Sequence, residues 1–156
     1  MTPFTAPQQR VKGFTLLELL VAIAVIAIVA AIAVPSFTEI VRQNRATNLA
    51  NSMVSALNLA RSEAVKRGAQ ASVSALESGW ETGWQVRAGG NELRRWPTEN
   101  ASVTPSVTTI TFNPRGRLAA ASGIQITVGV DAALRCVRVS LSGSARVAEQ
   151  RGTCDD

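Results

Sequence analysis

Histidine is missing from this 156-residue sequence, and cysteine occurs only at positions 136 and 154. The two cysteines do not form a CxxC pair, so neither a typical zinc site nor a histidine-based catalytic triad can be assembled. GxGxxG, Walker and GxSxG sequences are also missing. The acids Glu77, Glu81, Glu92 and Glu99 are scattered and have the pattern of surface charges. These absences argue against an enzyme, and we expect neither a cofactor nor a bound metal.

Charged residues are scarce, at 17% of the chain, and the formal charge of +5 is unevenly distributed. From Gly68 onward nine arginines face eight acids, which leaves a net charge of +1. Six of these arginines lie between Arg115 and Arg151, where the only acids are Asp131 and Glu149. A basic patch able to bind nucleic acid would therefore lie in the C-terminal third.

A long apolar run stands near the N-terminus. Residues 19–34 carry no polar side chain, and the stretch from Phe14 to Val34 is interrupted only by Thr15 and Glu18. As a helix this stretch would measure about 31 Å, the thickness of the hydrocarbon core of a bilayer. The sequence therefore predicts a membrane segment followed by a water-soluble remainder.

Two simple interpretations of this segment leave Glu18 unexplained. Arg10 and Lys12, followed by the Ala31-Ile32-Ala33 sequence, are typical of a secretory signal peptide. However, an ionised carboxylate inside an apolar helix costs about 2.5 to 3.5 kcal/mol on insertion scales. A plain single-span anchor, oriented by the two basic residues, explains the topology but gives the acid no role.

A cut between Gly13 and Phe14 would give Glu18 a partner. The new α-amino group would lie four residues before the carboxylate, and both groups would lie at the membrane surface. When such helices pack in an apolar filament core, the amine of one subunit can neutralise the carboxylate of its neighbour. Because a buried charge is tolerated only when it is paired, Glu18 would set the axial register of the subunits.

The sequence from Lys12 to Glu18, KGFTLLE, with the apolar run after it, resembles the signal of type IV prepilins and type II secretion pseudopilins. The resemblance implies that a membrane-bound prepilin peptidase cleaves after Gly13 and methylates Phe14. It also implies that Glu18 guides docking into the growing filament. Proteins of this family have a proline near the end of the buried helix, and Pro35 matches it, where we expect a kink.

Beyond Pro35, apolar residues recur every three or four positions from Leu49 to Ala64, which predicts an amphipathic helix. Gly68 suits the position after a helix end, so we expect one helix from about Phe14 to Arg67. The predicted division of the chain is a leader peptide (1–13), a transmembrane half of the helix (14–34), an amphipathic half (35–67) and a β-rich globular head (68–156).

After Gly68 the pattern changes to the alternation of half-buried strands, most clearly from Ile124 to Val130. Further strands are predicted at 71–76, 84–88, 93–96, 107–112 and 135–141, and a flexible loop at 98–106. The expected fold class is α+β and pilin-like, with the long helix packed on a C-terminal antiparallel β-rich domain.

Three ordered landmarks in this region resemble the GspH/FimT family of minor pilins and minor pseudopilins, which includes FimU-like proteins. They are the segments 79–86 (GWETGWQV), 110–116 (ITFNPRG) and 137–143. The resemblance implies a minor pilin in the initiating or tip complex of a type IV pilus, with a minor pseudopilin of a type II secretion system as the alternative. The implied partners are prepilin peptidase, other minor and major pilins or pseudopilins, and lipid of the inner membrane. The chain would cross that membrane once with a periplasmic head.

Cys136 and Cys154 are predicted to form a disulfide, because the head would lie in an oxidising compartment. Closing this loop is worth about 3 kcal/mol in the chain-entropy model and would fasten the C-terminus to the sheet. Two unpaired thiols are the alternative.

The same disulfide would hold Arg138, Arg146 and Arg151 near one another. Some FimT-like minor pilins bind DNA during natural transformation through a Gly-Arg-x-Arg sequence, and the resemblance makes DNA a candidate partner. The corresponding residues 143–146 are Gly-Ser-Ala-Arg, which keep the second arginine and lack the first. Arginine binding to phosphate scales with the number of contacts, so solvated surface arginines are the favoured interpretation.

Overall fold

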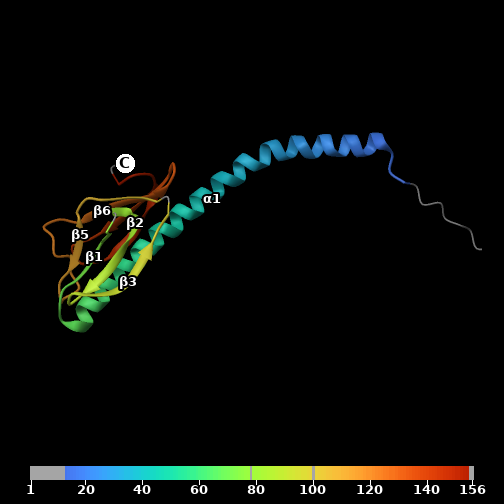
Figure 1. Cartoon of the computed structure of the whole chain (residues 1–156). Helices are drawn as coiled ribbons and strands as arrows, with labels where there is room; N and C mark the ends of the chain where they lie inside the picture. Colours follow the sequence, from blue (N-terminus) through green and yellow to red (C-terminus); the bar gives the residue numbers. More distant parts are fainter. Residues whose placement is uncertain (1–12, 78, 100, 155–156) are drawn as a thin grey trace, which may run out of the picture. The chain divides into compact units, whose positions relative to one another are not determined.

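The computed structural model describes residues 13–77, 79–99 and 101–154. In this part of the chain one helix, α1 (Leu16–Arg67), is followed by eight strands (Figure 1). They are β1 (Ala71–Leu76), β2 (Gly79–Ala88), β3 (Asn91–Pro97), β4 (Ser102–Pro105), β5 (Thr109–Phe112), β6 (Ile124–Val130), β7 (Ala133–Val139) and β8 (Ala145–Arg151). The chain divides between Thr38 and Glu39 into two compact units, and the second unit, the head unit, holds the strands.

The strands form two antiparallel sheets, with the orders β3-β2-β1-β5 and β4-β6-β7-β8. The turn between β2 and β3 is Gly89-Gly90, where φ is +59° and +82°, a left-handed backbone that glycine adopts without steric cost. The predicted α+β pilin architecture is confirmed, with one long helix on antiparallel sheets.

One face of the head-unit part of α1 packs against both sheets in a single apolar core. The buried helix residues are Ala50, Met53, Ala56, Leu57, Ala60 and Ala64. The sheets contribute the larger side chains, among them Val73, Trp84, Ile110, Phe112, Ile126 and Val137. Burying each large apolar side chain stabilises the fold by about 1.5 to 3 kcal/mol.

The alternation predicted for β6 is present. Ile124, Ile126 and Val128 are buried in the core, whereas Gln125 is exposed and Thr127 is half-buried. Because side chains of a strand alternate between two faces, Gln125 and Thr127 lie on the outer face of the sheet, away from α1. The same alternation in β7 buries Val137 and Val139 and exposes Arg138 on that outer face.

The prediction of a flexible loop at 98–106 is wrong. Residues 102–105 form β4, an edge strand that pairs with β6 from Ser102–Gly129 to Pro105–Ile126. Its only buried side chain is Val103, so the segment has almost no alternation to reveal it. Proline is tolerated at an edge because its missing N–H does not break the sheet. The strand predicted from Val107 begins instead at Thr109.

Candidate functional site

The first turn of α1 carries the residues predicted to act in assembly. Gly13, Phe14 and Thr15 precede the helix, which begins at Leu16. The backbone N–H of Glu18 donates a hydrogen bond of 3.2 Å to Thr15 Oγ1. Thr15 is therefore the N-cap and Glu18 occupies the third helical position, the spacing of a capping box. This helix-capping contact was not predicted from the sequence, because Glu18 stands out there only as a charge within an apolar run.

The Glu18 carboxylate is exposed, and no described residue donates a hydrogen bond to it. A helix N-terminus stabilises an anion by about 0.3 to 1 kcal/mol. That is less than the cost of about 2.5 to 3.5 kcal/mol for placing an ionised acid in an apolar helix environment. The helix terminus therefore offsets only part of this cost.

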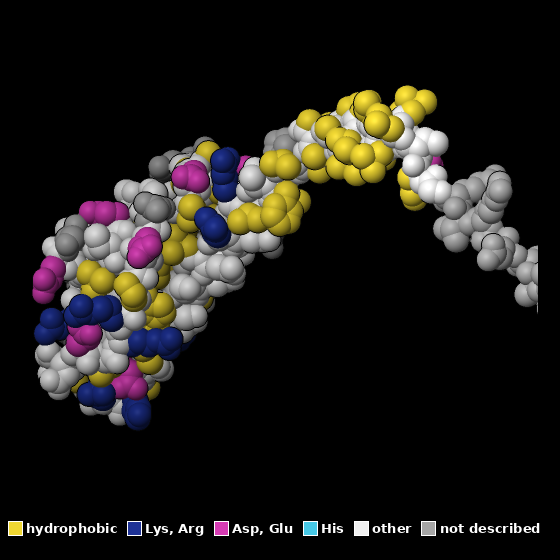
Figure 2. Space-filling view, turned by 45° about the vertical axis from the view of Figure 1, so that its right-hand side comes forward, with side chains coloured by type: hydrophobic (Ala, Val, Ile, Leu, Met, Phe, Trp, Pro, Cys, Tyr) yellow, Lys and Arg dark blue, Asp and Glu magenta, His cyan; other side chains and the backbone are white. Residues whose placement is uncertain are grey.

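Apolar side chains gather along the N-terminal part of α1, on the side seen in Figure 2, where they are yellow. The large apolar side chains are more than half exposed from Phe14 to Phe37. Contiguous apolar surface of this size is unfavourable in water and marks a protein or lipid contact. The helix is long and apolar enough to cross a membrane, and its most apolar window has no residue buried within the chain.

Three predicted features lie wholly or partly outside the described residues. Residues 1–12, which include Lys12 and most of the leader peptide, are not described. The side chains of Pro35 and Arg151 are not described either. The helix continues through Pro35, so the proline does not end it, and the kink stays a prediction.

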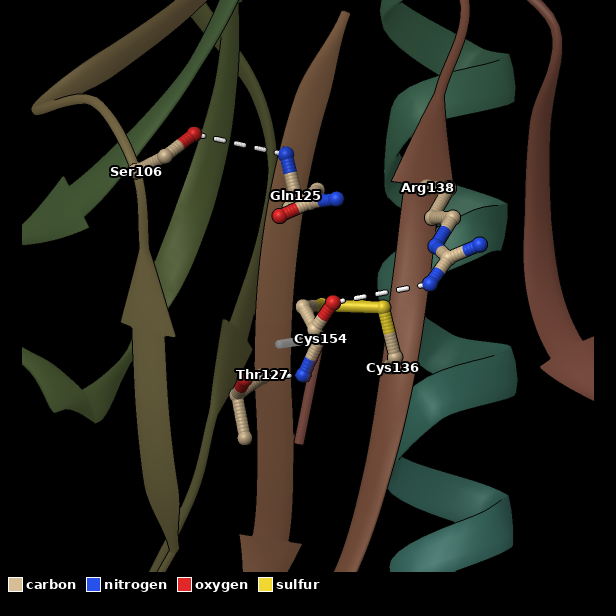
Figure 3. Close-up of a disulfide and its surroundings, with 6 residues drawn as sticks. All are labelled: Ser106, Gln125, Thr127, Cys136, Arg138 and Cys154. Carbon is tan, nitrogen blue, oxygen red and sulfur yellow. Dashed lines mark hydrogen bonds between the residues drawn. A yellow bond between two sulfur atoms is a disulfide. The ribbon is translucent and has the colours of Figure 1, made fainter. Parts of the chain in front are cut away.

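The Cys136–Cys154 disulfide is present, with the two Cα atoms 4.9 Å apart. Cys136 lies on the outer face of β7, and the chain beyond β8 folds back over this face (Figure 3). The backbone N–H of Cys154 donates to Thr127 Oγ1 at 3.3 Å, and Arg138 Nη2 donates to the Cys154 carbonyl at 3.5 Å. The disulfide and these two hydrogen bonds fasten the end of the described chain across β6 and β7.

Arg138 and Arg146 lie side by side because β7 and β8 are paired, rather than because of the disulfide. They are direct partners in the antiparallel register, and both are exposed. With Gln125, Ser140 and Ser144 they line a surface groove of about 540 Å³, which we call the arginine groove. Arg151 also belongs to β8, but its partner in the register is Arg135. It lies four residues after Val147, the residue that follows Arg146.

Two contacts that join α1 to the sheets were not predicted. Arg61 Nε donates to the carbonyl of Gly116 at 3.0 Å, and Arg135 Nη2 donates to Gln43 Oε1 at 2.8 Å. Arg135 is only 7% exposed, in contrast to Arg138 and Arg146. Its position in an alternating apolar strand was the one available signal, because that alternation directs residue 135 toward the helix. In the described ranges, no three His, Cys, Asp or Glu side chains gather to form a metal site.

Comparison with known proteins gives two family matches. The model of the family described as type II transport protein GspH matches residues 49–144. The model of the prokaryotic N-terminal methylation motif matches residues 8–34. Both matches reach into α1 but leave residues 35–48 between them uncovered, and the GspH match extends over most of the strands.

Two fimbrial proteins of Pseudomonas aeruginosa are each 44% identical to the chain over 57 residues, 36% of this chain. The matched part spans about a third, 36%, of the length of those relatives. Two crystal structures of the type IV minor pilin FimU of Pseudomonas aeruginosa superpose with TM-scores of 0.60 and 0.61. They are 21% and 22% identical, and the matches cover 69% and 76% of this chain and 98% of the FimU chain. Sharing the FimU fold and matching the GspH family model over most of its length, the chain belongs to the GspH family of pilin-like proteins.

Proposed function

We propose that this protein is a minor pilin, a structural component of the initiating or tip complex of a type IV pilus and not a catalyst. The observation that carries the proposal is Glu18, a lone acid in the first turn of a helix whose apolar surface is exposed over more than twenty residues. An ordinary membrane anchor has no use for this charge, whereas a helix that docks beside others of its kind does.

The proposed maturation supplies the missing cation. Prepilin peptidase cleaves between Gly13 and Phe14 and methylates the new N-terminus. A methylated amine remains a cation, so the Phe14 amine of an adjacent subunit can pair with Glu18. Only the correct axial position brings the two together, since any other leaves the acid unpaired in apolar surroundings. The match of the methylation motif over residues 8–34 supports this processing.

The segments then have distinct tasks. Residues 1–13 form the leader, and residues 14–34 hold the subunit in the inner membrane as a single pass before assembly. Residues 35–67 carry the head, residues 68–156, which would lie in the periplasm. The disulfide agrees with such an oxidising compartment.

The alternative within the same class is a minor pseudopilin of a type II secretion system, in line with the description of the matched family. We favour the pilus because the relatives that are 44% identical over 57 residues of the chain are fimbrial proteins. Deletion of the gene in the source bacterium discriminates between them. Loss of surface pili with normal export of secreted enzymes supports the pilus, and the reverse result supports secretion.

A DNA-binding minor pilin is a second candidate, which the paired Arg138 and Arg146 favour. Two arginines make few phosphate contacts, so any binding should be weak and strongly salt-dependent. A gel-shift assay with the full chain and with Arg146→Ala and Arg151→Ala tests this function. Absence of salt-sensitive binding at micromolar protein would remove DNA from the set of partners.

The central test examines both the cleavage of the N-terminus and the incorporation of the subunit into filaments. Mass spectrometry of the native protein should find an N-terminal methylated phenylalanine at position 14. Glu18→Gln keeps the size of the side chain and removes its charge, so it should be processed normally but enter filaments poorly. A native N-terminus elsewhere, or full incorporation of Glu18→Gln, would contradict the proposal.

A further inference from the structure

A hollow of about 490 Å³ lies between α1, the end of β3 and the segment that follows β3. This volume falls within the range of about 300 to 1,000 Å³ that is typical of small-molecule sites. All residues that line it belong to the head unit. We call it the tryptophan pocket, because its lining includes Trp84 of β2 and Trp96 of β3, which are direct partners in the antiparallel register.

One wall of the tryptophan pocket is a polar face of α1. Arg45, Asn48 and Ser52 line it at intervals of three and four residues, so they follow one another along the same side of the helix. The side chains of Asn48 and Ser52 form no hydrogen bond with another described residue. Their donors and acceptors are therefore available to a ligand.

A second wall is held in place by contacts within the chain. It consists of Trp96, Pro97, Thr98 and Glu99. The backbone N–H of Thr98 donates to the Thr82 carbonyl at 3.0 Å, and its Oγ1 donates to the Glu81 carbonyl at 2.9 Å. The Arg94 guanidinium lies 4.7 Å from the centre of the Trp96 ring, a cation–π contact that orients the ring. The wall is thus formed before any ligand arrives.

Trp84 lines the tryptophan pocket although its side chain is completely buried in the head unit. Its indole Nε1 has no hydrogen-bond acceptor in the part of the chain that the structure describes. Burial of an N–H without an acceptor is unfavourable, and native structures rarely retain such a group. A ligand oxygen in the neighbouring hollow is one source of the missing acceptor.

The charges of the tryptophan pocket favour a neutral ligand. Arg45 and Glu99 are both exposed, and neither forms a salt bridge within the described ranges. An anion would be attracted by Arg45 but repelled by Glu99, and a cation would meet the opposite forces. The charged residues that line the arginine groove, by contrast, are all positive. An acyl chain is also disfavoured, because it would take Asn48 and Ser52 out of water without offering them a hydrogen bond.

A sugar ring has the properties that such a pocket requires. Its hydroxyl groups donate and accept hydrogen bonds, so they complement Asn48, Ser52 and Glu99, and its C–H face can pack on an aromatic ring. We propose that the tryptophan pocket binds a neutral carbohydrate the size of a mono- or disaccharide, with hydroxyl groups bonded to Asn48 and Glu99 and a ring packed beside Trp96. The proposal concerns the head unit alone, and its failure would leave the proposed role in filament assembly unaffected.

Indole NMR of the full chain, in micelles of a detergent that has no sugar headgroup, tests the site directly. The probes are cellobiose, a disaccharide of glucose, and chitobiose, its counterpart with N-acetyl groups. At least one probe should move the Nε1–Hε1 signals of Trp84 and Trp96 in a saturable way. The signal of Trp80, which does not line the pocket, should stay in place. Movement with chitobiose alone would indicate a glycan of acetylated amino sugars, and movement with cellobiose an unsubstituted glycan; either result supports the proposal.

Asn48→Ala and Asn51→Ala are a matched pair of variants on α1. Both positions are exposed, but only Asn48 lines the pocket. Asn48→Ala should weaken binding of the disaccharide about three- to tenfold, the effect of one lost hydrogen bond, whereas Asn51→Ala should leave it unchanged. Equal losses in the two variants would overturn the proposal, as would tighter binding of inorganic triphosphate at the same two indoles. Absence of saturable movement with both disaccharides would also overturn it and would favour a pocket that another subunit fills.

Discussion

Arg61 and Gly116 join the last turns of α1 to the turn after β5. The Nε of Arg61 donates a 3.0 Å hydrogen bond to the Gly116 carbonyl. Gly143, from the turn between β7 and β8, lies so close that a Cβ on it would collide with the same carbonyl oxygen. Two turns from different sheets and one helix thus meet at a single point. The landmarks at 110–116 and 137–143, far apart in the sequence, converge here.

Gly143→Ala should therefore destabilise the head unit by about 2 to 4 kcal/mol. The residue has φ of +84°, which costs an L-residue about 1 to 2 kcal/mol, and the new methyl group would push Gly116 away from Arg61. Gly90→Ala is the matched control, because its φ is +82° but no atom lies within 4 Å of the added Cβ. Chemical denaturation of both variants measures the difference. Equal losses would mean that backbone strain alone, without the close packing, explains the effect.

Removing one partner of the Arg135–Gln43 hydrogen bond should destabilise the protein more than replacing both partners by apolar residues. Gln43→Leu removes an acceptor and leaves the buried guanidinium with one bond fewer, at a cost of about 1.5 to 3 kcal/mol. Adding Arg135→Met to Gln43→Leu removes the charge that suffers this loss, so the double variant should be more stable than Gln43→Leu alone. Urea unfolding of the two variants gives the comparison, and a less stable double variant would contradict the argument.

The disulfide should contribute about 3 kcal/mol, since it closes a loop with 17 residues between the cysteines. Reduction should lower the Tm of the unaltered protein to near that of Cys136→Ala/Cys154→Ala. The double variant serves as its own control, because reductant should leave its Tm unchanged. A Tm that does not respond to reductant in the unaltered protein would show that the tail adds no stability through this bond.

The sequence predicted the elements that have strong periodicity. The apolar run and the Leu49–Ala64 repeat predicted one helix, which the structure has at Leu16–Arg67. The alternation of Ile124–Val130 predicted β6. By contrast, β4 and β8 are edge strands with few apolar residues, and their stability comes from hydrogen bonds to β6 and β7. Local patterns carry no signal for such pairing.

The candidate sites were also predictable only where they depend on residues close together in the sequence. The role proposed for the Gly13–Glu18 segment involves six consecutive residues, so its chemistry can be reasoned from order and spacing. The contact between Arg61 and Gly116 spans 55 positions. The register that opposes Arg138 and Arg146 depends on the length of the turn at 140–144. A change of one residue in that turn would send the two arginines to opposite faces of the sheet.

The capping contact of Glu18 and its proposed role in subunit docking can be separated by substitution at Thr15. Thr15→Val removes the hydroxyl that accepts the Glu18 N–H, so helix initiation should weaken by about 0.5 to 2 kcal/mol while the carboxylate remains. If pairing with a neighbouring amine drives assembly, Thr15→Val should enter filaments at a level near that of the unaltered protein, and Glu18→Gln should not. Quantitative immunoblots of sheared filaments, with total cellular protein as reference, measure both variants. A loss of incorporation as severe in Thr15→Val as in Glu18→Gln would mean that the acid acts through the helix cap. The electrostatic role in subunit register would then have no support from this position.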